Sequence, residues 1–518
     1  MKIKIRPWGV FQEIIGEREL SMEVPENLTI SDLLDHLASS YGKKFGDELF
    51  QPDNKNIKPY IKILHNGHGA KLDSRLRDGD VVAIFPPVGG GHLVYEKIIH
   101  DPVHGSMRLS GLVLDLVDTP EVQRLRSIHQ LGLANLVFPG ANHTRFEHTL
   151  GVAYLVERLG RELNLSKREL NLLLAAAVLH DIGHAPYSHT LEYLMTNYLK
   201  KNHMELTGDI LLGKTSIYSE DELKKFSMLH LPSVVDVLAK YKISPNEVAQ
   251  LLLGKHRKPY LGQIIHGEID VDQLDYLLRD AHFTGVALGM VDTDRLLQTL
   301  TVHKGRLAIA SKGIEAVEGL LTARALMYTS VYYHHTVRIA ELMLANAVEF
   351  AIEQGSGRID KDNFYRLTDS GLLERLNEIR GYPHEIVTRL RYRQLFKTAY
   401  VEERRELSPA EKKRILKKYS GWSRVHELQN NIADKAGVPR GYVILDVPVV
   451  DILISEPRLE KVEVPVLVGK KLVGLSELSP IASALKKRQV PRYQLRVVAA
   501  PKYVNKVKKA AEKLCIFS

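Results

Sequence analysis

Apolar and polar residues in the first 90 positions follow two different periods. A period of two predicts short strands, and a helical period appears after Thr29-Ile-Ser-Asp32, a capping-box sequence followed by apolar residues at spacings of three and four. The predicted strands are residues 2–5, a segment near 21–24, and residues 60–64 and 81–85. This mixture predicts a small α+β domain over residues 1–91.

Helical spacing dominates residues 92–355, which we therefore expect to form a mainly α-helical domain. His148 shares one predicted helical face with Val152, Leu155 and Leu159. Because the other three residues are apolar, this face is expected to be buried, and His148 with it.

A second predicted helix ends in a histidine and an aspartate. It begins with the capping box Ser166 to Glu169, and its apolar stripe leads to His180 and Asp181 before Gly183 interrupts the helix. The sequence thus predicts a buried helix with His and Asp at its carboxyl end.

Two further helices carry polar side chains at helical spacing. Asp272, Tyr276 and Arg279 form one stripe, and Arg324 shares a face with Tyr332 two turns later. Such stripes usually face solvent, whereas acid, phenol and guanidinium groups close to several histidines favour a binding surface. Both interpretations remain open at this point.

Residues 356–518 mix strand-like and helix-like patterns and are predicted to form an α+β region. Ser408-Pro409 begins a Lys/Arg-rich helix, strands are predicted at residues 442–454, 462–468 and 494–499, and a helix is predicted at 503–514. We expect this region to serve oligomerisation or regulation.

Composition narrows the class of protein. No apolar stretch is long enough for a membrane span and no secretory signal pattern opens the chain, so a cytoplasmic protein without a membrane partner is expected. The single cysteine, Cys515, allows neither an intrachain disulfide nor a cysteine-based zinc site. The net charge of +9 suits a polyanionic partner, a nucleotide or a nucleic acid, and equally fits a generally basic surface.

The histidine and aspartate segments suggest a metal site. A single histidine is more often structural, but two imidazoles and two carboxylates form a donor set that divalent ions such as Mn, Fe, Co, Mg, Zn or Ni accept. Such a set leaves coordination positions for water and a phosphate oxygen, which metal-assisted hydrolysis requires.

The first 90 residues resemble the MoaD/ThiS-like sulfur carriers, a family of ubiquitin-like β-grasp proteins. The resemblance rests on the order of predicted elements and on the ending Asp78-Gly-Asp-Val-Val-Ala-Ile-Phe-Pro-Pro-Val-Gly-Gly. In that family the chain ends at the diglycine, whereas His92 follows here. A fused docking or regulatory module is the simpler interpretation, and a modifier or sulfur donor released by cleavage after the diglycine is the alternative.

Residues 99 to about 340 resemble the HD-domain phosphohydrolases, specifically the deoxynucleoside triphosphate triphosphohydrolase (dGTPase-like) branch that includes the vertebrate sterile-alpha-motif HD enzyme. The shared motifs are Asp101-Pro-Val-His-Gly, Asp118-Thr-Pro, Gln123-Arg-Leu-Arg126, Gln130-Leu-Gly, Val137-Phe-Pro-Gly-Ala, Arg145-Phe-Glu-His148, His180-Asp-Ile-Gly-His184, Ser188-His189 and Ile269-Asp-Val-Asp272.

The resemblance implies a role for each matching residue. The implied metal ligands are His148, His180, Asp181 and Asp272. The implied catalytic residues are His184 and His189 near the scissile phosphate, with His203 and Glu192 as an acid/base dyad. The implied substrate-binding residues are Gln130, Arg145, Tyr276, Asp280, Arg324 and Tyr332. Gln273 stands where the vertebrate enzyme has a phosphate-contacting lysine.

The same resemblance implies regulation by a second nucleotide. Asp118, Gln123 and Arg126 match residues that recognise an activating guanine nucleotide at a subunit interface, so a homo-oligomer, dimer or tetramer, is expected.

These observations together predict metal-dependent hydrolysis of a (deoxy)nucleoside triphosphate to nucleoside and inorganic triphosphate. Hydrolysis of another phosphoester, such as a nucleoside monophosphate or a cyclic nucleotide, uses the same site and stays an alternative. Nucleic-acid binding by the basic C-terminal region is a further alternative that the hydrolase interpretation does not require.

Overall fold

A computed structural model of the chain describes residues 1–51, 56–58, 61–85, 96–355, 357–404, 408–419, 422–447, 463–487 and 493–514. Contacts divide it into two compact units, residues 1–96 and 97–518. The diglycine with His92, and Cys515, lie outside the described residues. The boundary predicted near residue 355 falls within the second unit and stays a prediction. No described helix combines the length and apolar character needed to cross a membrane.

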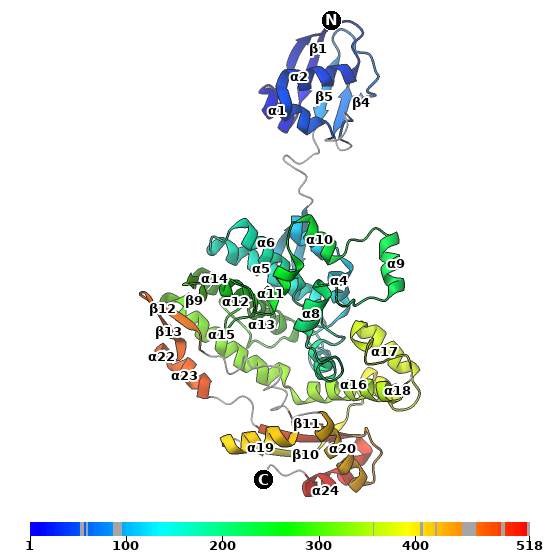
Figure 1. Ribbon diagram of the computed structural model, residues 1–518, viewed down its shortest axis with the longest axis vertical. Helices are drawn as coiled ribbons and strands as arrows, with labels where there is room; N and C mark the ends of the chain where they lie inside the picture. The colour runs from blue at the N-terminus through cyan, green and yellow to red at the C-terminus, as the bar shows by residue number, and fades with distance from the viewer. Residues whose placement is uncertain are drawn as a thin grey trace. The chain divides into compact units, whose positions relative to one another are not determined.

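The N-terminal unit is a β-grasp fold, as the sequence predicts (Figure 1). Its five-stranded sheet has the order β2-β1-β5-β3-β4, with β1 and β5 parallel and the other neighbours antiparallel. The elements are β1 Lys2–Pro7, α1 Val10–Ile15, β2 Leu20–Glu23, α2 Ile30–Leu49, β3 Lys62–His65, β4 His68–Gly69 and β5 Val81–Phe85.

Alternation along β1 explains how this unit folds. Ile3 and Ile5 are buried, whereas Lys2, Lys4 and Arg6 are exposed, so one face of the sheet packs against α2. The predicted capping box is present, because Thr29 accepts a hydrogen bond from the backbone of Asp32 and the Asp32 side chain bonds back. Local sequence and tertiary burial therefore agree over this unit.

The second unit opens with the β6–β7 hairpin and continues as a helical domain. The hairpin strands are β6 Glu96–Asp101 and β7 Gly105–Ser110. The helices that follow are α3 Gly111–Val117, α4 Pro120–Gln123, α5 Arg145–Glu162, α6 Lys167–Leu179, α7 Glu192–Leu194, α8 His203–Leu211, α9 Glu220–Met228, α10 Val234–Lys240, α11 Pro245–Leu252, α12 Pro259–His266, α13 Val271–Thr284, α14 Thr293–Thr299, α15 Ile314–Met327, α16 His335–Glu353, α17 Asp369–Glu378 and α18 Tyr382–Arg391.

Three of these helices form the frame of the candidate site. Helix α5 packs against both α6 and α13, and their apolar faces belong to one large core. Helices α5 and α6 each start with a capping box, Thr144 with Glu147 and Ser166 with Glu169, as the sequence of α6 predicts. The caps and the shared core hold the three helices in register.

The C-terminal region combines helices with two sheets. Strands β10 Lys397–Arg404, β14 Tyr493–Ala499 and β11 Val443–Asp446 form an antiparallel sheet in the order β10-β14-β11, which packs with α20 Trp422–Ala436 and α24 Val504–Leu514 (Figure 1). The remaining elements are α19 Pro409–Tyr419, β12 Pro465–Val468, β13 Lys471–Gly474, α22 Leu475–Leu478 and α23 Pro480–Lys487. The strand predicted at 442–454 is observed as β11, and residues 448–462 are not among those described.

One sheet joins distant parts of the chain. Strands β8 Leu300–His303 and β9 Arg306–Ala310 pair with β12 and β13 in the order β13-β12-β9-β8. The pairing of β9 with β12 is parallel, with Ile309 opposite Val466. The C-terminal region thereby completes a sheet that begins inside the helical domain.

Candidate functional site

Three of the four predicted metal ligands, His148, His180 and Asp181, form one buried group, and the fourth, the half-buried Asp272, lies beside His148. His148 Nε2 lies 3.1 Å from Asp272 Oδ1, 3.3 Å from His180 Nε2 and 3.9 Å from Asp181 Oδ2. His180 Nε2 lies 3.3 Å from Asp181 Oδ1. Two imidazoles and two carboxylates from distant stretches of chain therefore face one another.

Helix ends bring these residues together. His148 lies in the first turn of α5, His180 caps the carboxyl end of α6, and Asp272 lies in the first turn of α13. Asp270 caps α13 by accepting the backbone N–H of Gln273.

The donor set suits a divalent cation. Burial opposes a charge on His148, yet hydrogen bonds to Asp272 and Asp275 outweigh it and raise the pKa of His148 to about 10. The carboxylates thus attract positive charge to this point. Imidazole nitrogens and carboxylate oxygens are the donors that transition metals and Mg²⁺ accept, so the residues fit the metal that the sequence implies.

A second cluster contains all four predicted catalytic residues. Ligand atoms of His184, His189, Glu192 and His203 all lie within 4.8 Å of one another. The Nδ1 of His203 lies 3.0 Å from Glu192 Oε1, which also accepts the backbone N–H of His203 at 3.0 Å. The predicted dyad is therefore formed geometrically, although the acid is a glutamate.

His184 and His203, whose rings stack on each other, favour different protonation states. The rings of His184 and His203 lie 3.9 Å apart between centroids. Burial, with the charge of Arg145, lowers the pKa of His184 well below its ordinary value. Burial also disfavours protonated His203, but the Glu192 carboxylate outweighs it and raises the pKa of His203. The arrangement favours a neutral His184 beside a protonated His203.

Arg145 connects the predicted metal ligands, through Asp181, with this cluster. Its Nη1 donates to Asp181 Oδ2 at 2.5 Å and its Nε donates to Ser188 Oγ at 2.7 Å. Asp181 Oδ1 lies 3.4 Å from His184 Nε2. A buried guanidinium thus lies beside Asp181 and Ser188, and Asp181 in turn faces His184.

The other predicted substrate residues lie along α13 and its neighbours. Tyr332 donates to Asp280 Oδ2 at 2.7 Å, and the rings of Tyr276 and Tyr332 lie 6.1 Å apart. Arg324 Nη1 donates to the Oε1 of buried Gln273 at 2.9 Å. Gln130 Oε1 is buried with no hydrogen-bond partner. A polar ligand would satisfy this acceptor if it donates a hydrogen bond.

Two of the three predicted activator residues, Gln123 and Arg126, contact each other, and Asp118 pairs with Lys97. Lys97 Nζ donates to both carboxylate oxygens of Asp118, at 3.0 and 2.7 Å. Arg126 Nε donates to Gln123 Oε1 at 2.8 Å, and its guanidinium lies 3.6 Å above the ring of Phe146. Of these contacts, the one between Lys97 and Asp118 reaches the hairpin that opens the second unit.

Sequence reasoning missed several residues that support the metal set. Asp275 is fully buried and its Oδ2 lies 2.7 Å from His148 Nδ1. Of the two interpretations left open for the polar stripe, exposure to solvent does not hold for Arg279, which is fully buried and donates to Asp275. The spacing of three between Asp272 and Asp275 places both on one helical face and was the available signal.

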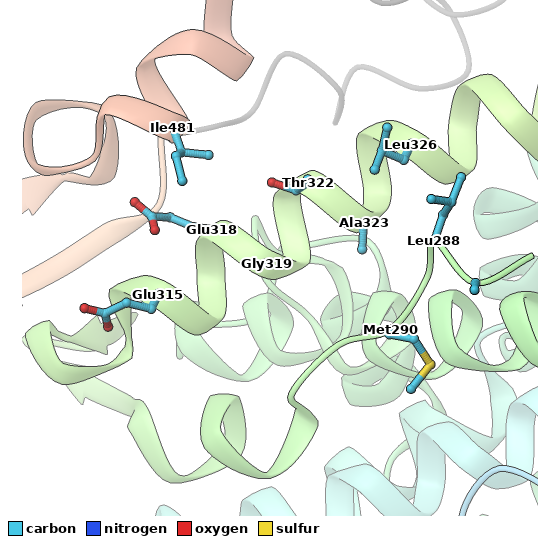
Figure 2. A pocket seen from close by; sticks show the side chains of 10 residues that line it. Leu288, Met290, Glu315, Glu318, Gly319, Thr322, Ala323, Leu326 and Ile481 are labelled. Carbon is cyan, nitrogen blue, oxygen red and sulfur yellow. The ribbon is translucent and has the colours of Figure 1, made fainter.

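Two surface cavities lie elsewhere in the second unit. One of about 370 Å³ runs along α15, between the loop that carries Leu288 and Met290 and Ile481 of α23 (Figure 2). The other, about 610 Å³, lies beside α17 and includes Arg124 and Arg375. Neither cavity is lined by a predicted metal, catalytic or substrate residue.

Comparison with protein families divides the chain in the same order as the fold. The HD domain matches residues 145–280, the HD associated region matches 291–516, and the ThiS family matches 8–91.

Individual proteins extend this likeness. An uncharacterised protein of Methanocaldococcus jannaschii is 31% identical over 416 residues, 80% of this chain and 81% of the relative. The human deoxynucleoside triphosphate triphosphohydrolase SAMHD1 is 29% identical over 60% of this chain, and the match spans 56% of the human protein's length. The bovine SAMHD1 is 31% identical over 54% of each chain.

Solved structures agree. A hypothetical protein from Aquifex aeolicus superimposes with a TM-score of 0.59 at 29% identity, covering 80% of this chain and 99% of that one. A phosphohydrolase from Bacteroides thetaiotaomicron gives 0.58 at 26% identity, covering 78% of this chain and all of that one.

Proposed function

Because the chain belongs to the HD-domain family of metal-dependent phosphohydrolases, we propose that it hydrolyses (deoxy)nucleoside triphosphates to nucleoside and inorganic triphosphate. The observation that carries the proposal is the adjacency of two groups, the metal donor set and the His184–Glu192–His203 cluster, with Arg145 between them. The basic net charge of +9 suits a triphosphate substrate.

His148, His180, Asp181 and Asp272 are the residues that would hold the metal. A bound divalent ion supplies Lewis-acid polarisation of a phosphate oxygen and lowers the pKa of water. The chain's own contribution begins with orientation, since Arg145 and Arg324 are both buried and held by side-chain partners. Fixed guanidinium groups can offset negative charge that develops on the phosphate in the transition state.

The dyad supplies the proton that the reaction needs. Water adds to the α-phosphorus and gives up one proton, the bond from phosphorus to the 5′-oxygen breaks, and that oxygen takes up a proton as the nucleoside leaves. His203, kept protonated by Glu192, is the proposed general acid. A positioned acid of this kind contributes roughly 10²–10⁴-fold to the rate.

Sugar recognition is assigned to the residues around Asp280. One contact group is formed by Asp280, Tyr276 and Tyr332. Gln130 lies next to this group, because its backbone N–H donates to the carbonyl of His143, and the ring of His143 contacts Asp280. Hydroxyl groups of a ribose or deoxyribose are suitable partners for these donors and acceptors.

The experiment is a substrate panel with purified, metal-loaded protein. Release of inorganic triphosphate from deoxynucleoside triphosphates supports the proposal, and Asp181→Asn should abolish it. Orthophosphate release from a monophosphate, or opening of a cyclic nucleotide, without triphosphate release would reject the triphosphate reaction and favour another phosphoester.

We also propose that Asp118, Gln123 and Arg126 bind an activating nucleotide in a homo-oligomer. Lys97 already binds the Asp118 carboxylate, so a bound nucleotide would have to compete with or join this ion pair. Rates measured with dATP in the presence and absence of GTP test the proposal, with Arg126→Ala as the variant expected to lose any stimulation.

A further inference from the structure

The turn between β6 and β7 contacts Asp275 and Arg279 of α13, which lie behind the proposed metal ligands. It contains the motif Asp101-Pro-Val-His104-Gly, to which no role has been given so far. Asp101 Oδ1 accepts the backbone N–H groups of Val103 and His104 at 2.9 and 2.8 Å, which shapes the turn. Gly105, with φ of 73°, adopts the left-handed conformation that ends it.

Asp101 and His104 both contact the same buried ion pair, which Asp275 and Arg279 form. His104 Nε2 lies 2.6 Å from Asp275 Oδ1, and Asp101 Oδ2 accepts Arg279 Nη1 at 2.7 Å. Arg279 in turn donates its Nε and Nη2 to the two oxygens of Asp275, each at 2.9 Å. Asp275 is therefore held by donors from the turn and from its own helix.

The remaining contact of Asp275 is with a metal ligand. His148 Nδ1 lies 2.7 Å from Asp275 Oδ2, while His148 Nε2 faces Asp272, His180 and Asp181. An ionised carboxylate beside Nδ1 favours the proton on that nitrogen, which leaves the lone pair of Nε2 free for a metal.

We propose that Asp275 is a positioning residue that orients His148 toward the metal, and that His104 and Asp101 of the β6–β7 turn hold it in place. The inference rests on the proposed metal site and adds its supporting layer. Partners of this kind commonly change metal affinity by about 10–100-fold when they are removed.

The carboxylate of Asp275 also packs against the backbone of α5. A Cβ added to Gly151 of α5 would lie 1.8 Å from Asp275 Oδ1, so the carboxylate lies directly against the helix that carries His148. Asp275 and His148 thus belong to facing helices whose separation is set at this glycine.

The test is the metal dissociation constant of the full-length protein, measured by competition of Mn²⁺ or Co²⁺ with a chelating dye. His104→Phe keeps a ring and removes the donor, whereas His104→Gln keeps an N–H donor. We expect about tenfold weaker binding for His104→Phe, at least as large a loss for Asp275→Asn, and affinity within about threefold of the unaltered protein for His104→Gln.

A matched control removes a His–Asp contact away from the metal. His65→Phe breaks the 2.7 Å contact with Asp80 in the N-terminal unit and should leave metal affinity unchanged. The visible spectrum of the Co²⁺ form gives a second readout, because a merely structural role of Asp275 would change thermal stability without changing the ligand field of the bound ion.

Two results would overturn the inference. One is metal affinity within twofold of the unaltered protein for both His104→Phe and Asp275→Asn. The other is a loss in His104→Gln without a loss in His104→Phe, which would assign the effect to ring packing against Tyr154, 5.2 Å away between centroids, and not to the hydrogen bond. Either result leaves the proposed hydrolysis standing, since that is tested by product release.

Discussion

Gly151 illustrates how a single residue can determine the distance between two helices. Its missing side chain lets the carboxylate of Asp275 approach the backbone of α5, with the guanidinium of Arg279 also within reach. Any larger residue would push α13 away from α5. Since His148 and Asp272 lie on these two helices, such a shift would also separate two of the proposed metal ligands.

Gly151→Ala is expected to destabilise the second unit by about 1–3 kcal/mol and to weaken metal binding, because its Cβ would overlap Asp275. The matched control is Gly319→Ala in α15, where no neighbouring atom lies within 4 Å of the added Cβ. That substitution should be neutral or stabilise by up to about 1 kcal/mol, since alanine favours helix. Thermal unfolding and metal titration of both variants provide the measurements, and equal stabilities would contradict the expectation.

The dyad makes a prediction about pH. Glu192 raises the pKa of His203, and protonated His203 is the proposed acid, so activity should fall as pH rises through that pKa. Glu192→Gln removes the carboxylate that most strongly opposes the effect of burial on the pKa of His203. The descending limb of the pH–rate profile should therefore move to lower pH.

Glu205→Gln, on the first turn of α8, is a suitable comparison for that experiment. Glutamine preserves its capping-box role with Asn202, so its profile should match that of the unaltered protein. A profile of Glu192→Gln that keeps its descending limb in place would show that His203 is not the group that titrates.

Part of this site could be predicted from the sequence. The motif resemblance implied four metal ligands and a four-residue catalytic cluster. The structure brings the cluster together and groups three of the implied ligands, with Asp272 3.1 Å from His148. No role could be assigned to His104 and Asp275, and Arg279 was left between a solvent-facing stripe and a binding surface, because their contacts form only when the hairpin folds against α13. Their contacts span up to 178 positions of sequence, a separation that local periodicity does not encode.

At the scale of elements, the sequence predicted the helices that begin with a capping box. Helices α2 and α6 begin where their capping boxes predicted, because Thr29 and Ser166 satisfy backbone N–H groups that the helix leaves unpaired. The approach of α8 to the end of α6 was not predictable. A Cβ at Gly183 would lie 2.4 Å from the carbonyl oxygen of His203, so this glycine permits contact as well as ending a helix.

Capping boxes should differ in importance according to what their helices bury. Ser166→Ala removes the cap of α6, whose face lies in the core and whose end carries His180, and should cost about 1 kcal/mol of unfolding free energy. Ser219→Ala removes the same motif from α9, which buries no residue, and should change global stability much less. Denaturant unfolding of both variants measures the difference, and equal losses would refute this reasoning.

At the scale of the molecule, two units with separate cores should respond separately to metal. A saturating divalent ion, at about 100 times its dissociation constant, should stabilise the second unit by about 2.7 kcal/mol through binding to the native state alone. The β-grasp unit contributes none of the proposed ligands and should unfold at an unchanged temperature. Calorimetry with metal and with chelator tests this, and a joint shift of both transitions would argue against independent units.

The parallel pairing of β9 with β12 has a consequence for anyone who wishes to shorten the chain. A fragment that stops near residue 355 would retain β8 and β9 but lose the partner that covers Ile309 and Ala310. Its β9 would then present unsatisfied amide and carbonyl groups along an apolar border, a common starting point for intermolecular strand addition. Such a fragment should self-associate in solution, and supplying the missing strand as a peptide should suppress that behaviour.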